Sequence, residues 1–196
     1  MDELAFLKNW VQRLRHLVWF GTHQRTTNMS IAEHCYVTAV TAMLLCDQLG
    51  VSVQQERDIL RSALVHDLEE GFTADINSLA KRLDGNFAAV WKTVRERSMQ
   101  DVIAPPNLVL RSWRQGDHPV VKAADKLSMW LYAVEEVDMG NALMRSVCYV
   151  VSVWLSQDAE EYQFLRSWSE AVGIENRRRG ITGTDMSENM EFVLQK

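Results

Sequence analysis

Two histidines and two aspartates are the residues in this sequence with the clearest potential for metal chemistry. His66 and Asp67 are adjacent, His34 lies one predicted helix earlier, and Asp125 lies within a later helical pattern. Imidazole nitrogens and carboxylate oxygens form a mixed site that suits Zn²⁺, Mn²⁺, Co²⁺ or Fe²⁺, whereas structural zinc favours thiolates. Such a site keeps positions open for water and a phosphate oxygen. The pattern therefore indicates a catalytic ion that promotes hydrolysis.

Asp125 lies in an apolar string, VVKAADKL, whose helical spacing turns the aspartate partly toward the core. A buried carboxylate requires a partner. A salt bridge to Lys122 or Arg61 would meet that requirement without any metal. We favour the ligand interpretation because the helices that carry His34 and His66 are expected to converge on the same place.

Two further carboxylates are candidates for acid–base work. Glu70 follows Asp67 by three residues, so a continuing helical turn places it beside the site, where it would position or deprotonate water. The alternative is that Glu69 and Glu70 form a solvated acidic pair at a helix end. Asp75 is a second candidate for acid or base, and its alternative role is helix capping ahead of Asn77.

The elements that must position these residues are predicted to be helices, because apolar residues recur at steps of three and four. Ser30 and Glu33 form a capping box at the start of the second helix, and Gly50 suits a left-handed C-cap. The segment 19–29 has no sustained period, and we interpret it as a loop that lines the site. The helices are expected at about residues 4–18, 30–49, 53–67, 77–83, 86–102, 119–134, 141–155 and 157–172.

The fold class predicted from these patterns is all-α, as one compact helical bundle. Three prolines and nine glycines among 196 residues are too few for an all-β protein with many tight turns. We expect one domain over residues 1–173. The polar segment 174–196, which includes three consecutive arginines, is expected to be a loose tail or an arm that docks on a neighbour. In the helix at 86–102, Phe87, Val90, Trp91 and Val94 are expected to face inward.

Composition excludes several other classes of protein. A formal charge of −5 and a pI near 5.6 argue against stable nucleic-acid binding, although a small anionic substrate remains compatible. Three cysteines without a Cys-x-x-Cys spacing suit a reducing compartment. We find no signal peptide and no apolar run long enough for a bilayer. The expected location is the cytoplasm, or the host cytoplasm for a phage-encoded protein, with no membrane association.

These motifs together resemble the HD-domain phosphohydrolases, and in particular their bacterial 5′-deoxynucleotidase branch. The four candidate ligands resemble the family's H…HD…D signature. The string SIAEH at 30–34 resembles its helix start, HDLEEGFTAD at 66–75 matches its H-D-x-x-E-x-x-T-x-D run, and VKAAD at 121–125 resembles its V-K-x-A-D. Lys81 falls where the family has a lysine. The resemblance covers roughly residues 1–160.

The resemblance implies a helical bundle of the HD-domain type, usually a homodimer, that uses a divalent ion, often Co²⁺, Mn²⁺ or Zn²⁺. It also implies that Glu70 and Asp75 lie near the attacking water and the leaving oxygen, with Lys81 near phosphate. Substrates of this branch are deoxynucleoside 5′-monophosphates, so we expect a 5′-deoxynucleotidase. A sister group found in phages instead removes triphosphate from dNTPs such as dATP. That reaction needs further cations, for which Lys81, Lys122, Arg25 and Lys126 are available.

One departure from the family pattern concerns the substrate. The Arg-Trp pair that the family carries ahead of its first metal histidine is replaced by Trp19 and Phe20. An aromatic ring there can stack on a base or a sugar, although both residues equally suit the core at the end of helix one. The residues expected to contact substrate are Trp19, Phe20, Arg25, Thr73, Lys81 and Lys122.

Two alternatives without catalysis are also considered. A nucleotide sensor would keep the metal site and lose turnover, but the presence of both Glu70 and Asp75 argues against it. A partner-binding bundle would use the seven tryptophans as interface anchors. Those tryptophans fall mainly on apolar helical stripes, so core packing explains them better.

Overall fold

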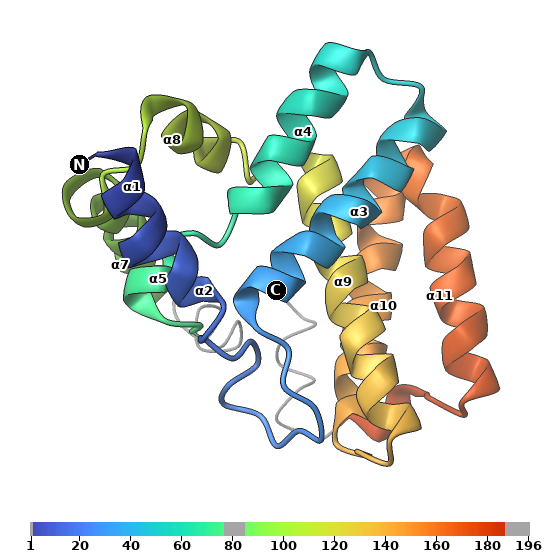
Figure 1. The fold of residues 1–196 in the computed structure, drawn as a ribbon. Helices are drawn as coiled ribbons and strands as arrows, with labels where there is room; N and C mark the ends of the chain where they lie inside the picture. The colour runs from blue at the N-terminus through green and yellow to red at the C-terminus, as the bar shows by residue number, and fades with distance from the viewer. Residues whose placement is uncertain (1, 77–84, 187–196) are drawn as a thin grey trace.

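The computed structural model describes residues 2–76 and 85–186, and helices dominate both ranges (Figure 1). Within them the extended pairing is limited to an isolated bridge between Val18 and Ser30. None of the described helices has the length and apolarity that a membrane crossing requires. The helices are α1 (Glu3–Phe6), η1 (Leu7–Val11), α2 (Gln12–Leu14), α3 (Ile31–Leu49), α4 (Val53–Val65), α5 (Glu70–Thr73), α7 (Gly85–Arg97), η2 (Ser98–Ile103), α8 (Asn107–Arg114), α9 (Pro119–Asp138), α10 (Met144–Glu161), η3 (Gln163–Leu165), α11 (Arg166–Arg178) and η4 (Gly183–Asp185).

Helix α9 occupies the centre of the fold. It packs against α3 on one side and α10 on the other, and α11 covers α10 from outside (Figure 1). Helix α4 contacts α3, α8 and α9, while the short helix α5 contacts α2 and η1 of the N-terminal segment. Fully buried side chains such as Leu45, Val121 and Leu155 join these helices into one apolar core. The bundle therefore brings together the start of α3, the end of α4 and the first half of α9.

The predicted boundaries of the second helix are confirmed. The Ser30 hydroxyl accepts a hydrogen bond from the Glu33 amide at 3.2 Å, and the Glu33 carboxylate accepts one from the Ser30 amide at 2.7 Å. Gly50 closes the helix with φ of 61°, in the left-handed region that favours glycine. The N-cap of helix α3 thus lies four residues before His34, which fixes the register of that side chain.

The N-terminal helix ends at Leu14, earlier than the predicted end at residue 18. The following segment leaves the helix because it pairs with the start of α3. The Trp19 amide donates to the Met29 carbonyl at 2.8 Å, and the Ile31 amide donates to the Leu17 carbonyl at 3.0 Å. These bonds tie both ends of the predicted loop 19–29 together.

Helix α7 buries only part of the predicted apolar face, because Trp91 is half-buried and its three companions are exposed. Phe87, Val90 and Val94 are 38%, 60% and 37% exposed. Burial begins only in the π-helical turn η2, where Met99 and Ile103 are fully buried. Helix α8, which the sequence patterns did not predict, follows Pro106 and buries Trp113. The predicted small helix at 77–83 lies outside the described residues.

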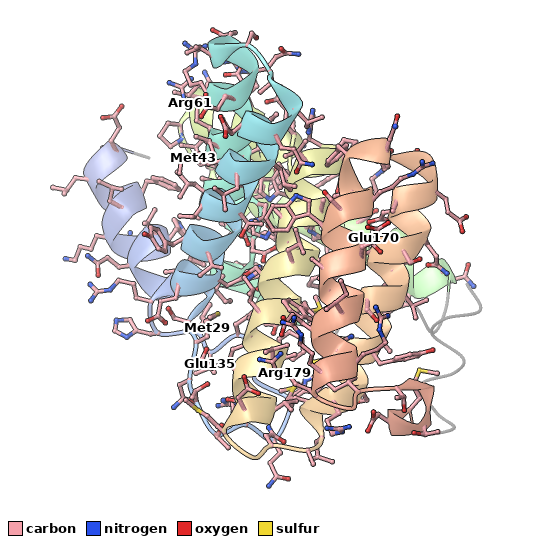
Figure 2. The ribbon with its side chains drawn as sticks, turned by 90° about the vertical axis from the view of Figure 1, so that its right-hand side faces the viewer. Met29, Met43, Arg61, Glu135, Glu170 and Arg179 are labelled. Carbon is pink, nitrogen blue, oxygen red and sulfur yellow. The ribbon has the colours of Figure 1, made fainter. Side chains whose placement is uncertain are left out.

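The described part of the C-terminal segment, residues 174–186, is more ordered than a loose tail. Helix α11 runs to Arg178, so the boundary expected at residue 173 falls inside a helix. Arg179, labelled in Figure 2, pairs with Asp138 at 2.9 Å at the end of α9. Further on, Ile181 is buried and Arg145 pairs with Asp185 at 2.7 Å. Residues 174–186 therefore pack against the bundle.

Replacing Ser30 with Ala is expected to lower the free energy of unfolding by about 1 kcal/mol, because the first turn of α3 loses its side-chain cap. Urea unfolding followed by circular dichroism measures this change. Ser30→Thr is the matched control, since it keeps the hydroxyl and should lose much less stability. Equal losses in the two variants would mean that the cap does not stabilise α3.

Candidate metal centre

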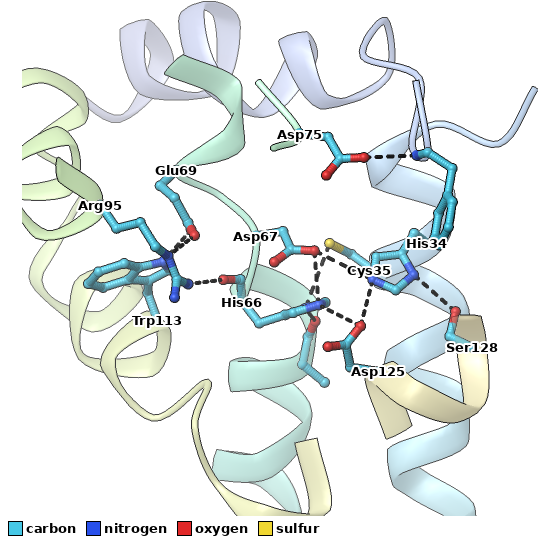
Figure 3. Close-up of polar contacts among 12 residues, drawn as sticks. His34, Cys35, His66, Asp67, Glu69, Asp75, Arg95, Trp113, Asp125 and Ser128 are labelled. Carbon is cyan, nitrogen blue, oxygen red and sulfur yellow. Dashed lines mark hydrogen bonds and ion pairs between the residues drawn. The ribbon is translucent and has the colours of Figure 1, made fainter. Parts of the chain in front are cut away.

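The four predicted ligand residues converge at one point of the fold (Figure 3). His34 Nε2 lies 3.4 Å from Asp67 Oδ2 and 3.2 Å from Asp125 Oδ1. His66 Nε2 lies 3.1 Å and 3.8 Å from the same two oxygens. The ligand atoms of His34, His66 and Asp67 all lie within 4.8 Å of one another. The helices therefore form a possible His/Asp metal site, and Asp125 approaches it from α9.

The opposite ring nitrogens hold the two imidazoles in place. His66 Nδ1 lies 2.8 Å from the Ala63 carbonyl and donates a hydrogen bond to it, so the neutral form of the ring would carry its lone pair on Nε2. His34 Nδ1 lies 3.0 Å from the Ser128 hydroxyl. Both Nε2 atoms are buried and have no hydrogen-bond partner within the described residues. Two buried Nε2 atoms aimed at one space, each on a ring whose second nitrogen is held by a hydrogen bond, fit the donor pattern of a metal site.

The histidines and aspartates of this cluster shift one another's pKa values. Burial alone would lower the pKa of both imidazoles, but the two carboxylates outweigh it and raise the pKa of His34 and, more strongly, of His66. Burial would raise the pKa of Asp67 and Asp125, yet the facing imidazoles hold the pKa of both well below the usual range. Burial also raises the pKa of the neighbouring Cys35 thiol. The carboxylates are therefore ionised near neutral pH, whereas Cys35 is a neutral thiol.

A pocket of about 120 Å³ opens beside the ligand cluster. Glu70 lines it and is only 4% exposed, so the alternative of a solvated acidic pair is wrong for this residue. Of the residues that line the pocket, none of those described is a lysine or an arginine. We call it the carboxylate pocket, and its described lining consists of Trp19, Phe20, Thr22, His23, Asp67, Glu70, Asp75, Ile76, Asp125 and Met129.

Asp75 joins the two loops at the mouth of this pocket. Its Oδ2 accepts a hydrogen bond from the Phe20 amide at 2.8 Å. Phe20 and Ala74 have φ of 56° and 59°, a region that non-glycine residues rarely adopt. The hydrogen bond therefore helps to keep two unfavourable backbone conformations on either side of the pocket entrance.

The residues predicted to contact substrate lie in different surroundings. Trp19 is buried and stacks on His34, with ring centroids 3.7 Å apart and an interplanar angle of 15°. Arg25 is held inside its own loop by Asn28 and backbone carbonyls. The Thr73 hydroxyl donates within α5, to the Glu69 and Ala74 carbonyls. Neither Arg25 nor Thr73 is among the described lining of the carboxylate pocket. Lys122 lies in a different pocket, and Lys81 lies outside the described residues.

Glu69 forms a buried polar cluster behind the ligands. It is 2% exposed, and it accepts hydrogen bonds from Arg95 Nε and, at 2.6 Å, from the Trp113 indole. Arg95 Nη2 also donates to the His66 carbonyl at 3.4 Å. Glu69 is therefore not solvated, and the cluster fixes the backbone of the His66-Asp67 pair from the side opposite to Asp125. Sequence patterns missed this cluster because they do not reveal which distant cation meets Glu69.

One face of α9 links the metal centre to the loop 19–29. Asp125 and Ser128 contact the histidines, and Tyr132, one turn further, packs against Trp19. Glu136, another turn on, is fully buried and accepts hydrogen bonds from the amides of Thr26 and Thr27, each at 2.7 Å. Residues at steps of three and four share a helix face. This spacing was available in the sequence, but no pattern there indicated that the loop would reach Glu136.

Solved structures share this fold. A crystal structure of an HD-domain phosphohydrolase from Listeria innocua aligns with a TM-score of 0.74 and 16% identity, covering 98% of this chain and 93% of that one. A crystal structure of a protein from Pyrococcus horikoshii OT3 aligns with a TM-score of 0.68 and 21% identity, covering 87% and 98%. At these identities the likeness concerns the fold. The chain therefore has the fold class of these proteins, and its possible His/Asp metal site lies inside that fold.

The sequence specifies the family within that class. The family described as 5′-deoxynucleotidase YfbR-like matches residues 6–157, and the chain belongs to it. The 5′-deoxynucleotidase YfbR of Salmonella paratyphi B is 28% identical over 131 residues, and the same protein of Salmonella newport matches equally. These matches cover 60% of this chain and 64% of the length of each relative. The predicted family resemblance and all-α fold are confirmed.

Replacing Glu136 with Gln is expected to destabilise the protein in a pH-dependent way. Burial would raise the pKa of Glu136, but hydrogen bonds from Asn141, Thr27 and the Thr26 amide lower it from 4.5 to about 2. A carboxyl group with a depressed pKa stabilises the fold above its unfolded pKa, and this contribution disappears as the pH falls toward 2. The shift corresponds to about 3 kcal/mol.

Urea unfolding of the wild type and Glu136→Gln at about pH 7 and about pH 3 tests this expectation. The difference in free energy of unfolding should be largest at the higher pH and should shrink at the lower one. A difference of the same size at both pH values would contradict the assigned role of the ionised carboxylate.

Proposed function

We propose that this protein is a metal-dependent 5′-deoxynucleotidase, which converts deoxynucleoside 5′-monophosphates to deoxynucleosides and phosphate. The observation that carries the proposal is the convergence of His34, His66, Asp67 and Asp125 beside a pocket that contains Glu70. Membership in the YfbR-like family, and the printed function of its Salmonella relatives, support the same reaction.

The donor set fits a divalent ion of the Mn²⁺, Co²⁺ or Zn²⁺ type. Two neutral imidazoles and two carboxylates are borderline and hard ligands, which these ions accept together. The nearby Cys35 is a buried neutral thiol, so the described surroundings do not offer a thiolate. A bound ion would supply positive charge against the phosphate oxygens and would lower the pKa of water.

Within this proposal, the protein residues divide the work by position. His34, His66, Asp67 and Asp125 hold the ion. Glu70, buried on the first turn of α5 and lining the same pocket, orients the attacking water and takes its proton. Asp75 at the pocket mouth keeps the Phe20 loop in place through its hydrogen bond and stays our candidate for the proton donor to the leaving oxygen.

A monophosphate suits the carboxylate pocket better than a longer phosphate chain. The described lining of the pocket contains four carboxylates and no lysine or arginine. A second and third phosphate would therefore meet negative side chains, and the described lining offers them no lysine or arginine. Phe20 and Met129 line the same pocket and offer apolar surface to a sugar or a base.

The triphosphohydrolase alternative has weaker support. Of the cations considered for outer phosphates, Lys126 pairs with Asp158 at 2.5 Å and Arg25 is bound within its loop. Lys122 pairs with Asp117 at 3.3 Å in another pocket, and Lys81 lies outside the described residues. The sensor alternative loses support because Glu70 lies in the same pocket as the ligands. A homodimer and a cytoplasmic location stay predictions.

The direct test of the activity incubates the purified protein with Mn²⁺, Co²⁺ or Zn²⁺ and a panel of deoxy- and ribonucleoside mono- and triphosphates. Chromatography identifies the products. We expect deoxynucleoside and inorganic phosphate from the deoxynucleoside monophosphates. Release of triphosphate from dNTPs would replace the proposal with the triphosphohydrolase reaction, and absence of product with every metal would favour the sensor.

Replacing Asp67 with Ala is expected to remove both bound metal and hydrolysis, because the site loses a charged ligand that faces both imidazoles. Metal content by inductively coupled plasma mass spectrometry and phosphate release measure the two effects. Asp47→Ala, which removes an exposed aspartate from α3, is the control and should change neither quantity. Wild-type metal content in Asp67→Ala would remove this residue from the ligand set.

Replacing Glu70 with Gln should separate binding from catalysis. We expect metal content near that of the wild type and a fall in kcat of roughly 10²- to 10⁴-fold, because the amide cannot accept the proton of water. KM should change little. If metal content fell together with kcat, Glu70 would instead be a ligand.

A further inference from the structure

A second pocket, of about 260 Å³, lies on the side of His66 that carries Arg95 and Trp113 (Figure 3). Four cationic and two acidic side chains line it, in contrast to the carboxylate pocket on the other side of the His66-Asp67 pair. We call it the basic pocket. Its lining cations are Lys92, Arg95, Arg114 and Lys122.

Arg95 is oriented before any ligand arrives. Its Nε donates a hydrogen bond to the Glu69 carboxylate, and its Nη2 donates one to the His66 carbonyl. A guanidinium has five N–H donors, so three N–H groups of Arg95 make no hydrogen bond within the described residues. A planar cation held by a buried carboxylate loses little freedom when it binds an oxyanion, and its remaining N–H groups match the geometry of phosphate.

The other cations add charge that the described structure does not neutralise fully. Lys92 and Arg114 make no ion pair within the described residues. Lys122 pairs with Asp117, whose side chain is 81% exposed, so this contact is weak and easily exchanged. Glu96 and Asp117 oppose an anion. Even with Glu69 counted against Arg95, the side chains that line the pocket carry more positive than negative charge, and Asp125 and Asp67 act on Lys122 from the side of the metal centre.

The basic pocket also contacts the metal centre through the protein backbone. Gly116 lies in its lining, and a Cβ built there would come within 3.0 Å of the Trp113 carbonyl and 3.3 Å of His66 Cβ. The turn after α8 therefore packs directly on a candidate ligand. An anion bound to Arg95 would therefore lie next to the side chain that hydrogen bonds to the His66 carbonyl.

We propose that the basic pocket binds a phosphate-type anion, either inorganic phosphate or the phosphate chain of a nucleotide. This site is separate from the carboxylate pocket, and the proposal does not depend on the activity proposed above. Its chemistry requires oriented N–H donors and excess positive charge, both of which the carboxylate pocket lacks in its described lining.

The test measures binding in the metal-loaded full-length protein that carries Glu70→Gln, which prevents turnover. Equilibrium dialysis determines the number and affinity of bound ions with two probes, inorganic phosphate and a non-hydrolysable deoxynucleoside triphosphate. The variant Lys92→Ala/Arg114→Ala removes two cations of the basic pocket. Arg166→Ala/Arg177→Ala, on the distant helix α11, removes the same charge and is the matched control.

We expect two binding sites for at least one probe, and a roughly tenfold weaker second site in Lys92→Ala/Arg114→Ala alone. The Trp113 indole signal in ¹H–¹⁵N NMR spectra should shift as that site fills. Dependence of inorganic phosphate binding on the two cations identifies free phosphate as the occupant, and dependence of the triphosphate alone identifies the nucleotide chain. Identical binding of both probes in the variant and its control overturns the proposal, whatever the activity assay gives.

Discussion

The convergence of two imidazoles and two carboxylates in a buried space is the constraint on which the rest of this structure depends. Four charged or polar side chains buried side by side are costly unless they share a partner. Specific contacts hold the two imidazoles in place: His66 Nδ1 hydrogen bonds to the Ala63 carbonyl, and His34 Nδ1 contacts the Ser128 hydroxyl. Trp19 stacks on His34 and restricts that ring further. These supports leave both Nε2 atoms directed at the same oxygens.

Helix α9 connects the candidate metal ligands to the loop 19–29, which lines the carboxylate pocket. Because Asp125, Ser128, Tyr132 and Glu136 follow one another at steps of three or four residues, one helix face contacts the ligands and the loop 19–29 in turn. The His66-Asp67 pair separates two pockets of opposite character. Glu69 and Arg95 form the boundary on one side, and Asp75 with Phe20 forms the entrance on the other. The proposed hydrolysis and the proposed anion binding would thus both depend on the backbone of the His66-Asp67 pair.

The parts of this arrangement that depend on local pattern could be predicted from the sequence. Ser30 and Gly50 define α3 through contacts within a few residues, and the register of His34 follows from them. The candidate metal ligands also lie in short motifs that can be recognised from neighbouring residues. In contrast, Glu69 meets Arg95 and Trp113, 26 and 44 residues away, and nothing in the local sequence specifies those partners.

The substrate contacts were harder to predict for the same reason. Arg25 and Lys122 have suitable charge, but loop geometry turns Arg25 into its own backbone and the helix face carries Lys122 to the basic pocket. Helix α7 shows the limit of periodicity, since its apolar face at Phe87 and Val90 is exposed. Apolar spacing predicts a helix but does not establish which neighbour covers it.

The central claim is that His34, His66, Asp67 and Asp125 bind one divalent ion together. A crystal structure of the Mn²⁺- or Co²⁺-loaded protein, with anomalous diffraction measured at the absorption edge of the metal, tests it most directly. The account predicts a single strong peak within about 2.0–2.3 Å of both Nε2 atoms and of one oxygen from each aspartate. A peak elsewhere, or one that lacks either histidine, would contradict it.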